Sequence, residues 1–185
     1  MNKEKLEQIL SELEKTQKDF WNVSRSTGNF LNMLVKMNNS KKVLEIGTSN
    51  GYSGLWFLSA LEVTGGHLTT IEFYDKRQSI ARQNYDDCGF EGKYTALLGS
   101  ASLILKEFEE NEKFDFVFID ACKKEYIDYF KIIKPHLSPN AIIAADNVTS
   151  HREKVQDFLD AISSDEDFQT EILDLPAGLS VSYLK

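Results

Sequence analysis

The chain has 185 residues, of which 42% are hydrophobic and 27% charged, and its formal net charge is −8. This size and composition are typical of one globular domain with a sizeable core, and the negative charge disfavours a broad electrostatic grip on nucleic acid. The two cysteines, Cys88 and Cys122, fit neither a disulfide framework nor a zinc motif. No apolar run approaches the roughly 18 to 20 residues that span a membrane, and the charged start is unlike a signal peptide, so we expect a cytoplasmic protein.

The spacing of apolar residues predicts an alternation of strands and helices after two N-terminal helices. Helices are expected at 3–19, 28–37, 52–61, 75–87, 102–109, 126–134 and 153–162, and strands at 43–46, 67–71, 94–98, 114–119, 141–145, 169–173 and 179–184. This alternation is typical of an α/β fold in which helices cover both faces of a parallel sheet. The turn between the last two strands is too short for a parallel crossover, so these strands should pair antiparallel.

Acidic residues stand at the end of four of the five strands that are expected to run parallel. Glu45, Glu72, Asp120 and Asp146 close these apolar runs. Because the carboxyl ends of parallel strands meet at one edge of a sheet, where ligands of such folds bind, these side chains should gather at one rim. Clustered carboxylates repel one another and favour a bound cation or a cationic ligand.

The turn after the first strand, residues 45–53, has the sequence EIGTSNGYS. Its glycines are spaced G-x-x-x-G, unlike the G-x-G-x-x-G that holds a dinucleotide pyrophosphate, and the turn contains no Lys or Arg. Glu45 opposes a pyrophosphate and suits a ligand that carries an amino group and a sulfonium, while Glu72 is placed to accept the hydroxyls of a ribose. The pattern therefore favours S-adenosylmethionine over the NAD that a dehydrogenase would need. The alternative is a tight turn with incidental acids.

A second polar group follows the fourth and fifth strands. Asp120, Asp146 and Asn147 offer hard oxygen ligands that suit a partly hydrated divalent cation, Mg²⁺ first and otherwise Ca²⁺ or Mn²⁺. Helix capping by the same residues is the alternative. Lys123, three residues after Asp120, could act as a base beside such a cation, although a loop lysine is by default a solvated charge and Lys124 adjoins it.

Three segments in this order resemble the cation-dependent O-methyltransferases, the group that contains the catechol and caffeoyl-CoA enzymes and many small bacterial relatives. They are VLEIGTSNGYS at 43–53, FDFVFIDACKKEYIDYF at 114–130 and IIAADNV at 142–148, and the similarity runs from about Trp21 to the C-terminus. The resemblance implies a Rossmann-like class I methyltransferase fold, with seven strands in the order 3-2-1-4-5-7-6. It also implies a single domain over 1–185, in which helices within 1–38 cover the cofactor and substrate side.

The resemblance further implies the roles of individual residues. The residues that match the family's cofactor site are Val23, Glu45, Gly47, Thr48, Ser49, Tyr52, Ser53, Glu72, Phe73, Ser100, Ala101 and Asp120. Asp120, Asp146 and Asn147 match its metal ligands, and Lys123 matches its catalytic lysine, which acts together with Asp120. The implied activity is a metal-assisted transfer of a methyl group from S-adenosylmethionine to a hydroxyl of a small acceptor, such as a phenol or a vicinal diol.

Departures from the family pattern leave the acceptor open. The chain passes quickly from Asn147 into the next helix, Ser180 stands where the catechol enzymes have a glutamate, and Ala177 replaces an aspartate, so catechol itself is not expected. Two alternatives are a tRNA base-oxygen methyltransferase, for which lysines could supply local charge, and a non-catalytic protein that only binds the cofactor. A homodimer that uses the N-terminal helix is a further hypothesis. Trp21 and Trp56 could line a pocket, but core positions are the stronger expectation for large aromatic residues.

Overall fold

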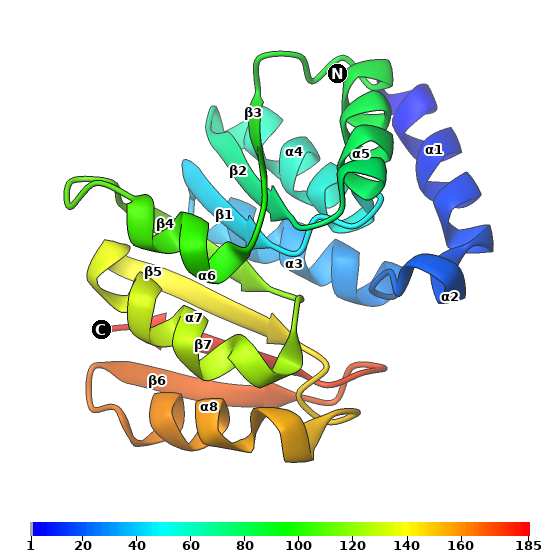
Figure 1. Ribbon diagram of the computed structural model, residues 1–185. Coiled ribbons are helices and arrows are strands. Elements are labelled where there is room, and N and C mark those ends of the chain that lie inside the picture. The colour runs from blue at the N-terminus through cyan, green and yellow to red at the C-terminus, as the bar shows by residue number, and fades with distance from the viewer. Residues whose placement is uncertain (1) are drawn as a thin grey trace.

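The computed structural model describes residues 2–185, and these form a seven-stranded sheet with the order β3-β2-β1-β4-β5-β7-β6 (Figure 1). The strands are β1 (Lys42–Ile46), β2 (His67–Glu72), β3 (Tyr94–Leu98), β4 (Phe114–Ile119), β5 (Leu137–Asp146), β6 (Phe168–Leu173) and β7 (Leu179–Leu184). The first five run parallel, and β7 pairs antiparallel with both β5 and β6. The expected strand order and the antiparallel strand pair at the end of the chain are both confirmed.

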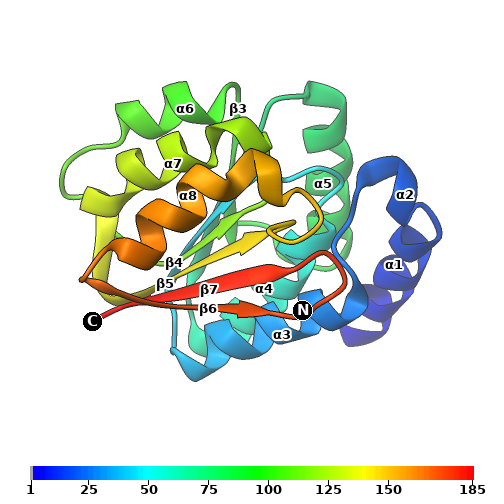
Figure 2. The ribbon, with the colours of Figure 1, turned by 90° about the horizontal axis from the view of Figure 1, so that it is seen from below.

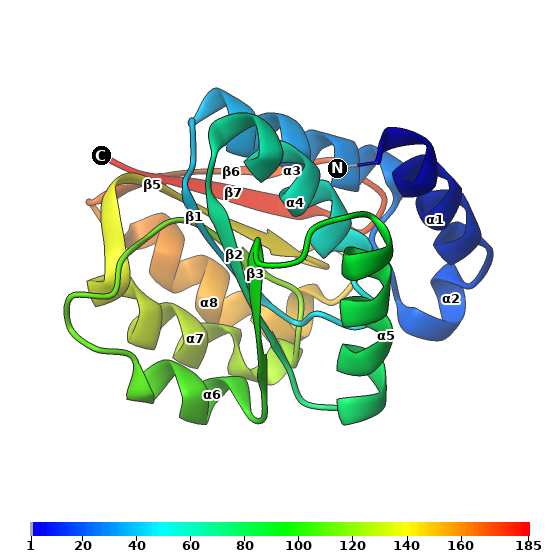
Figure 3. The same cartoon turned by 90° about the horizontal axis from the view of Figure 1, so that it is seen from above.

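Helices cover both faces of the sheet, as Figures 2 and 3 show. They are α1 (Lys3–Lys15), α2 (Gln17–Phe20), α3 (Arg25–Met37), α4 (Tyr52–Thr64), α5 (Asp75–Asp87), α6 (Ala101–Ile104), α7 (Tyr126–Ile133) and α8 (Arg152–Ser164), with short 3₁₀ turns after α6, before α7 and after α7. Alternate strand residues face opposite sides: Phe116 and Phe118 belong to the core under α1, α3, α4 and α5, and Val117 and Ile119 to the core under α7 and α8. Burial on both faces explains why the strands are nearly continuous apolar runs.

The N-terminal region differs from the sequence-based expectation. A single helix was expected over 3–19, but the chain breaks at Thr16 into α1 and α2, and α2 ends where Trp21 takes a left-handed conformation with φ 55°. The Thr16 hydroxyl donates to the Leu13 carbonyl oxygen, which satisfies a carbonyl at the end of α1. The helix expected at 28–37 begins earlier, at Arg25, because the Ser24 hydroxyl accepts a hydrogen bond from the Thr27 backbone N–H.

Later elements also differ in length: α4 continues to Thr64 and α8 to Ser164, and α6 and β5 differ the most. The helix expected at 102–109 is the short α6 followed by a 3₁₀ turn to Glu107. The strand expected at 141–145 begins at Leu137. The pairing with β4 shifts register between Phe114 and Phe116, and Asn140 is left-handed, so the strand accommodates Pro139. Such irregularities let a strand continue past a proline that cannot donate to the ladder.

The register brings the carboxyl ends of four strands level with one another. Ile46 of β1 pairs with Ile71 of β2 and Ile119 of β4, and Ile119 pairs with Ala145 of β5. The residues that follow these positions therefore emerge side by side at one edge of the sheet. Within residues 2–185, every helix is too short or too polar to cross a membrane.

Candidate active site

The turn after β1 passes directly against the end of β4. Gly47 has φ +106°, and a Cβ atom there would overlap the Asp120 carbonyl oxygen. Only glycine adopts this positive φ easily and also leaves room for the carbonyl oxygen. This close contact therefore fixes the distance between the turn and the first residue after β4. The turn is also joined to β2 because the Gly47 and Thr48 N–H groups both donate to the Ile71 carbonyl oxygen.

Glu45 lies beneath this turn, fully buried, and its side chain does not reach the cavity above it. The Ser53 hydroxyl donates to Oε1 at 2.5 Å and the Thr70 hydroxyl to Oε2 at 2.6 Å. Burial outweighs these two hydrogen bonds and raises the pKa of Glu45 to about 8. Glu45 is therefore largely protonated at neutral pH in this structure, and it braces Ser53 from below.

The raised pKa of Glu45 gives a testable pH dependence. Between its usual value of 4.5 and about 8, the folded protein binds more protons at Glu45 than the unfolded chain does, so this residue makes stability fall as pH rises through that window. Replacing Glu45→Gln should remove this contribution, roughly 2–4 kcal/mol between pH 5 and 9. Urea unfolding of both proteins at pH 5, 7 and 9 measures the difference. A difference between the two proteins that stays constant with pH would contradict the assignment.

Glu72 lies at the end of β2, only 6% exposed, and its carboxylate is held in place by backbone donors. Its Oε2 accepts from the Ser49 N–H at 2.8 Å and its Oε1 from the Tyr74 N–H at 2.8 Å. The first contact ties the glycine turn to β2. The carboxylate borders the cavity, where it can meet a ligand that offers hydroxyl groups.

Asp120, Lys123, Asp146 and Asn147 come together at the ends of β4 and β5. The Lys123 Nζ donates to Asp120 Oδ1 at 2.8 Å, and the Asn147 Nδ2 donates to Asp120 Oδ1 at 2.9 Å and to Asp146 Oδ2 at 2.8 Å. Asn147 has φ 67°, a left-handed conformation that asparagine tolerates better than most residues. The two carboxylates therefore share one amide donor, and only Asp120 has a lysine partner.

Asp146 is the most confined member of this cluster, at 3% exposure. Its Oδ1 is buried and has no hydrogen-bond partner among residues 2–185. Burial, and after it the negative charge of Asp120, raise the pKa of Asp146. A buried carboxylate oxygen without a donor is costly, and the cost falls if a cation binds there. Among residues 2–185, no group of three or more His, Cys, Asp or Glu side chains is arranged to hold a metal, so any cation here would take its other ligands from Asn147, water or a substrate.

A cavity of about 630 Å³ joins the glycine turn, Glu72 and the acidic cluster. The predicted site residues that line it are Val23, Gly47, Thr48, Ser49, Ser53, Glu72, Phe73, Ser100, Ala101, Asp120, Lys123 and Asn147. Glu45, Tyr52 and Asp146 lie behind its wall, and the Tyr52 hydroxyl donates to Glu14 on α1 at 2.8 Å. Lys124, the neighbour of Lys123, is exposed and does not line the cavity.

The cavity also has a wall formed mostly by residues that sequence reasoning missed. Residues that line it and were not predicted are Phe20, Asn22, Ile71, Tyr74, Arg77, Gly99, Glu125, Tyr129 and His151, and Trp21, Ala121 and Cys122 line it as well. Trp21 was expected in the core, but its side chain is exposed. The one available signal was its position two residues before Val23, in the segment that the family resemblance brings over the cofactor.

The connection from β5 to α8 borders the cavity and is short. Val148 N–H donates to the Gly178 carbonyl oxygen, and the Thr149 and Ser150 N–H groups both donate to the Ala177 carbonyl oxygen, at 3.0–3.1 Å. These bonds tie the connection to the turn between β6 and β7. Thr149 and Ser150 are exposed, so this side of the site faces solvent.

The sequence is similar to those of known O-methyltransferases. A family model described as O-methyltransferase matches residues 1–172. The chain is 37% identical over 128 residues to a catechol O-methyltransferase from Niastella koreensis, which covers 68% of this chain and 58% of that protein. It is 34% identical over 148 residues to caffeoyl-CoA O-methyltransferase 1 from Arabidopsis thaliana, with 72% and 54% covered. The chain thus spans between half and two thirds of the length of these curated relatives.

A solved structure agrees over the whole chain. The O-methyltransferase from Bacillus cereus, crystallised in complex with SAH, superposes with a TM-score of 0.86 at 28% identity and covers 100% of this chain and 92% of its own.

Proposed function

The chain belongs to the O-methyltransferase family, and from this premise we propose that it transfers a methyl group from S-adenosylmethionine to a hydroxyl of a small acceptor with the help of a divalent cation. The observation that carries the proposal is the single cavity that joins Glu72 and the glycine turn to Asp120, Lys123 and Asn147. A donor site and a proton-accepting site thus open into one space.

The walls of the cavity suit S-adenosylmethionine. The acids at the strand ends favour a ligand with an ammonium and a sulfonium group, Glu72 offers a carboxylate to ribose hydroxyls, and Gly47 leaves room for close approach of the backbone. The bound cofactor supplies a methyl group on a positively charged sulfur. We propose that Val23, Ser49 and the other predicted cofactor residues on the wall contact it, while Glu45 and Tyr52 support the wall from behind.

The acidic cluster suits a cation. Asp146 Oδ1 is buried without a partner, and in the structure the two carboxylates face the Asn147 amide and the Lys123 ammonium. We propose that Asp120, Asp146 and Asn147 hold the metal, with Mg²⁺ as the first choice because all three offer hard oxygen ligands. A metal bound there would act as a Lewis acid and lower the pKa of a hydroxyl that it contacts.

The remaining steps belong to side chains of this chain. Lys123, oriented by its 2.8 Å contact with Asp120, accepts the hydroxyl proton at Nζ when it is neutral. The glycine turn and Glu72 hold the methyl donor on one side of the cavity, and the ends of β4 and β5 hold the acceptor oxygen on the other. Fixing both reactants in one cavity supplies much of the rate acceleration.

The surroundings of the site narrow the choice of acceptor. Ser180 is 1% exposed and does not line the cavity, so its hydroxyl cannot reach the second hydroxyl of a catechol there. Of the lysines that could support tRNA binding (Lys41, Lys42, Lys123, Lys124, Lys131 and Lys134), Lys123 alone lines the cavity. Lys41 and Lys42 lie at the amino ends of the strands, and Lys134 pairs with Asp165 and Asp167. We therefore propose a small phenolic acceptor.

We further propose that residues 1–185 form a single domain and that the protein forms a homodimer through α1. Light scattering over a range of concentrations tests the homodimer.

The proposal is tested by a transfer assay with purified protein. Labelled S-adenosylmethionine is supplied with catechols, phenylpropanoids and unmodified tRNA, with Mg²⁺ or with excess EDTA. We expect methylation of a phenolic acceptor with Mg²⁺ and its loss with EDTA. Full transfer in EDTA would refute the role of the metal, and transfer to tRNA alone would refute the acceptor class.

A further inference from the structure

Trp21 is a large aromatic residue in an unusual place. Its side chain is 72% exposed, and its backbone has φ 55°, a conformation that is rare for bulky residues. An exposed indole contributes little to the core, and strained backbone conformations concentrate at binding sites. Trp21 also borders the cavity, so its position calls for an explanation in terms of a ligand.

The indole meets an arginine from a distant part of the chain. The guanidinium carbon of Arg77, on α5, lies 4.9 Å from the ring centroid of Trp21 and 5.2 Å from that of Tyr74. All three side chains line the cavity, next to Glu72 and Phe73. The segment before α3 and the first turn of α5 are thus joined by a cation–π contact at the edge of the cavity.

The backbone around Trp21 is anchored on both sides. The Ser49 hydroxyl of the glycine turn donates to the Phe20 carbonyl oxygen at 2.9 Å, and the Asn22 Nδ2 donates to the Leu13 carbonyl oxygen of α1 at 3.3 Å. These bonds, which do not involve the indole, hold the segment over the cavity.

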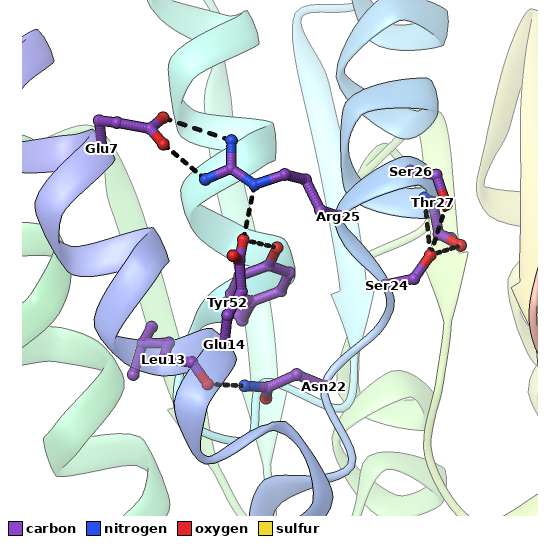
Figure 4. Close-up of polar contacts among 9 residues, drawn as sticks. All are labelled: Glu7, Leu13, Glu14, Asn22, Ser24, Arg25, Ser26, Thr27 and Tyr52. Atoms are coloured by element: carbon purple, nitrogen blue, oxygen red, sulfur yellow. Dashed lines mark hydrogen bonds and ion pairs between the residues drawn. The ribbon is translucent and has the colours of Figure 1, made fainter.

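α1 is itself fixed to the body of the protein by a polar network (Figure 4). Arg25 of α3 pairs with Glu7 at 2.6 Å and with Glu14 at 2.8 Å, and Glu14 accepts the hydroxyl of Tyr52 on α4. The indole of Trp21 therefore projects from a fixed support, and the cation–π contact can open without unfolding that support.

We propose that Trp21 and Arg77 form a clasp, defined as these two side chains in contact, which closes over the bound nucleoside cofactor and slows its release. The inference rests on the proposed function, since it takes S-adenosylmethionine and its product as the ligands of the cavity. The indole supplies a large apolar face at the mouth of the cavity, and Arg77 holds that face in position.

The test measures binding of S-adenosylhomocysteine by calorimetry, so it does not depend on turnover. Trp21→Ala and Arg77→Ala should each raise Kd about tenfold, with faster release in stopped-flow measurements. The double variant should bind little worse than either single variant, because the two side chains act as one unit. Thermal unfolding should change little in Trp21→Ala, because the side chain is exposed.

The second tryptophan provides a matched control. Trp56 also lies near an arginine, with the Arg25 guanidinium carbon 5.8 Å from its ring centroid, but it does not line the cavity. Because the chain has two tryptophans, fluorescence separates them. The ligand should change the emission of wild type and Trp56→Phe, and leave the emission of Trp21→Phe unchanged.

The outcomes distinguish the two proposals. Wild-type protein that binds no S-adenosylhomocysteine would overturn the proposed function and the clasp together. Wild-type binding with an unchanged Kd and release rate in Trp21→Ala would overturn the clasp and leave the proposed function intact. Additive effects in the double variant would show that the two residues act separately, which also overturns the clasp.

Discussion

Replacement of Asp146→Asn should reduce methyl transfer by at least about 100-fold, because it removes one of the two carboxylates proposed to hold the cation. Asparagine keeps the shape of the side chain and removes its charge. Asp146 lies behind the cavity wall, so binding of S-adenosylhomocysteine should be nearly unchanged. Steady-state transfer rates over a Mg²⁺ titration measure the first effect, and calorimetry measures the second.

The same substitution should not weaken the fold. Burial raises the pKa of Asp146 and one of its oxygens has no donor, so the charged form is a cost to the folded state without metal. Asp160→Asn, on the exposed side of α8, controls for loss of a negative charge at a distance from the cavity. Asp146→Asn protein that transfers methyl groups at the wild-type rate and with the wild-type Mg²⁺ dependence would exclude the proposed metal site.

Replacement of Lys123→Met should lower kcat by about 100- to 10,000-fold, the range that general bases contribute. Methionine has a similar length and apolar stem but cannot accept a proton. The Lys123 ammonium contacts Asp120 at 2.8 Å in the structure, so the variant also frees that carboxylate, and its affinity for Mg²⁺ should not fall. Rapid-quench measurement of a single turnover isolates the chemical step from product release.

The adjacent residue is the control for Lys123. Lys124 carries the same charge one position along the chain, but it is exposed and does not border the cavity. Lys124→Met should therefore transfer methyl groups at nearly the wild-type rate. An equal decrease of kcat in Lys123→Met and Lys124→Met would show that the effect comes from the loss of local charge, and would contradict the role of Lys123 as base.

The sheet could be predicted because its strands carry a strong pattern. Strands buried on both faces are mostly apolar, and parallel strands put their final residues at one edge of the sheet. The sequence therefore predicts that Glu72, Asp120 and Asp146 lie close together. The sequence did not show which of these side chains reach the cavity. All four acids end similar apolar runs, yet Glu45 and Asp146 lie behind the cavity wall. The reason is that the turn after each strand decides whether the last side chain is covered.

The N-terminal region was less predictable for a different reason. Apolar periodicity continues from α1 into α2, and the break at Thr16 depends on a hydrogen bond between side chain and backbone that leaves little trace in that periodicity. The pocket position of Trp21 was the weaker of two expectations, because its contact with Arg77 joins residues far apart in the sequence. Composition alone favours a core tryptophan, and only a tertiary contact decides otherwise.

The short connection between β5 and α8 has a consequence for the range of molecules that the site can admit. Its backbone is tied to the turn between β6 and β7, and Thr149 and Ser150 face water. In the proposed function, the acceptor hydroxyl lies beside Asn147, and the far end of the acceptor can thus project past the rim into bulk solvent. The site then selects among acceptors by the few atoms around the reacting oxygen, and the length of the rest of the acceptor does not affect whether it binds.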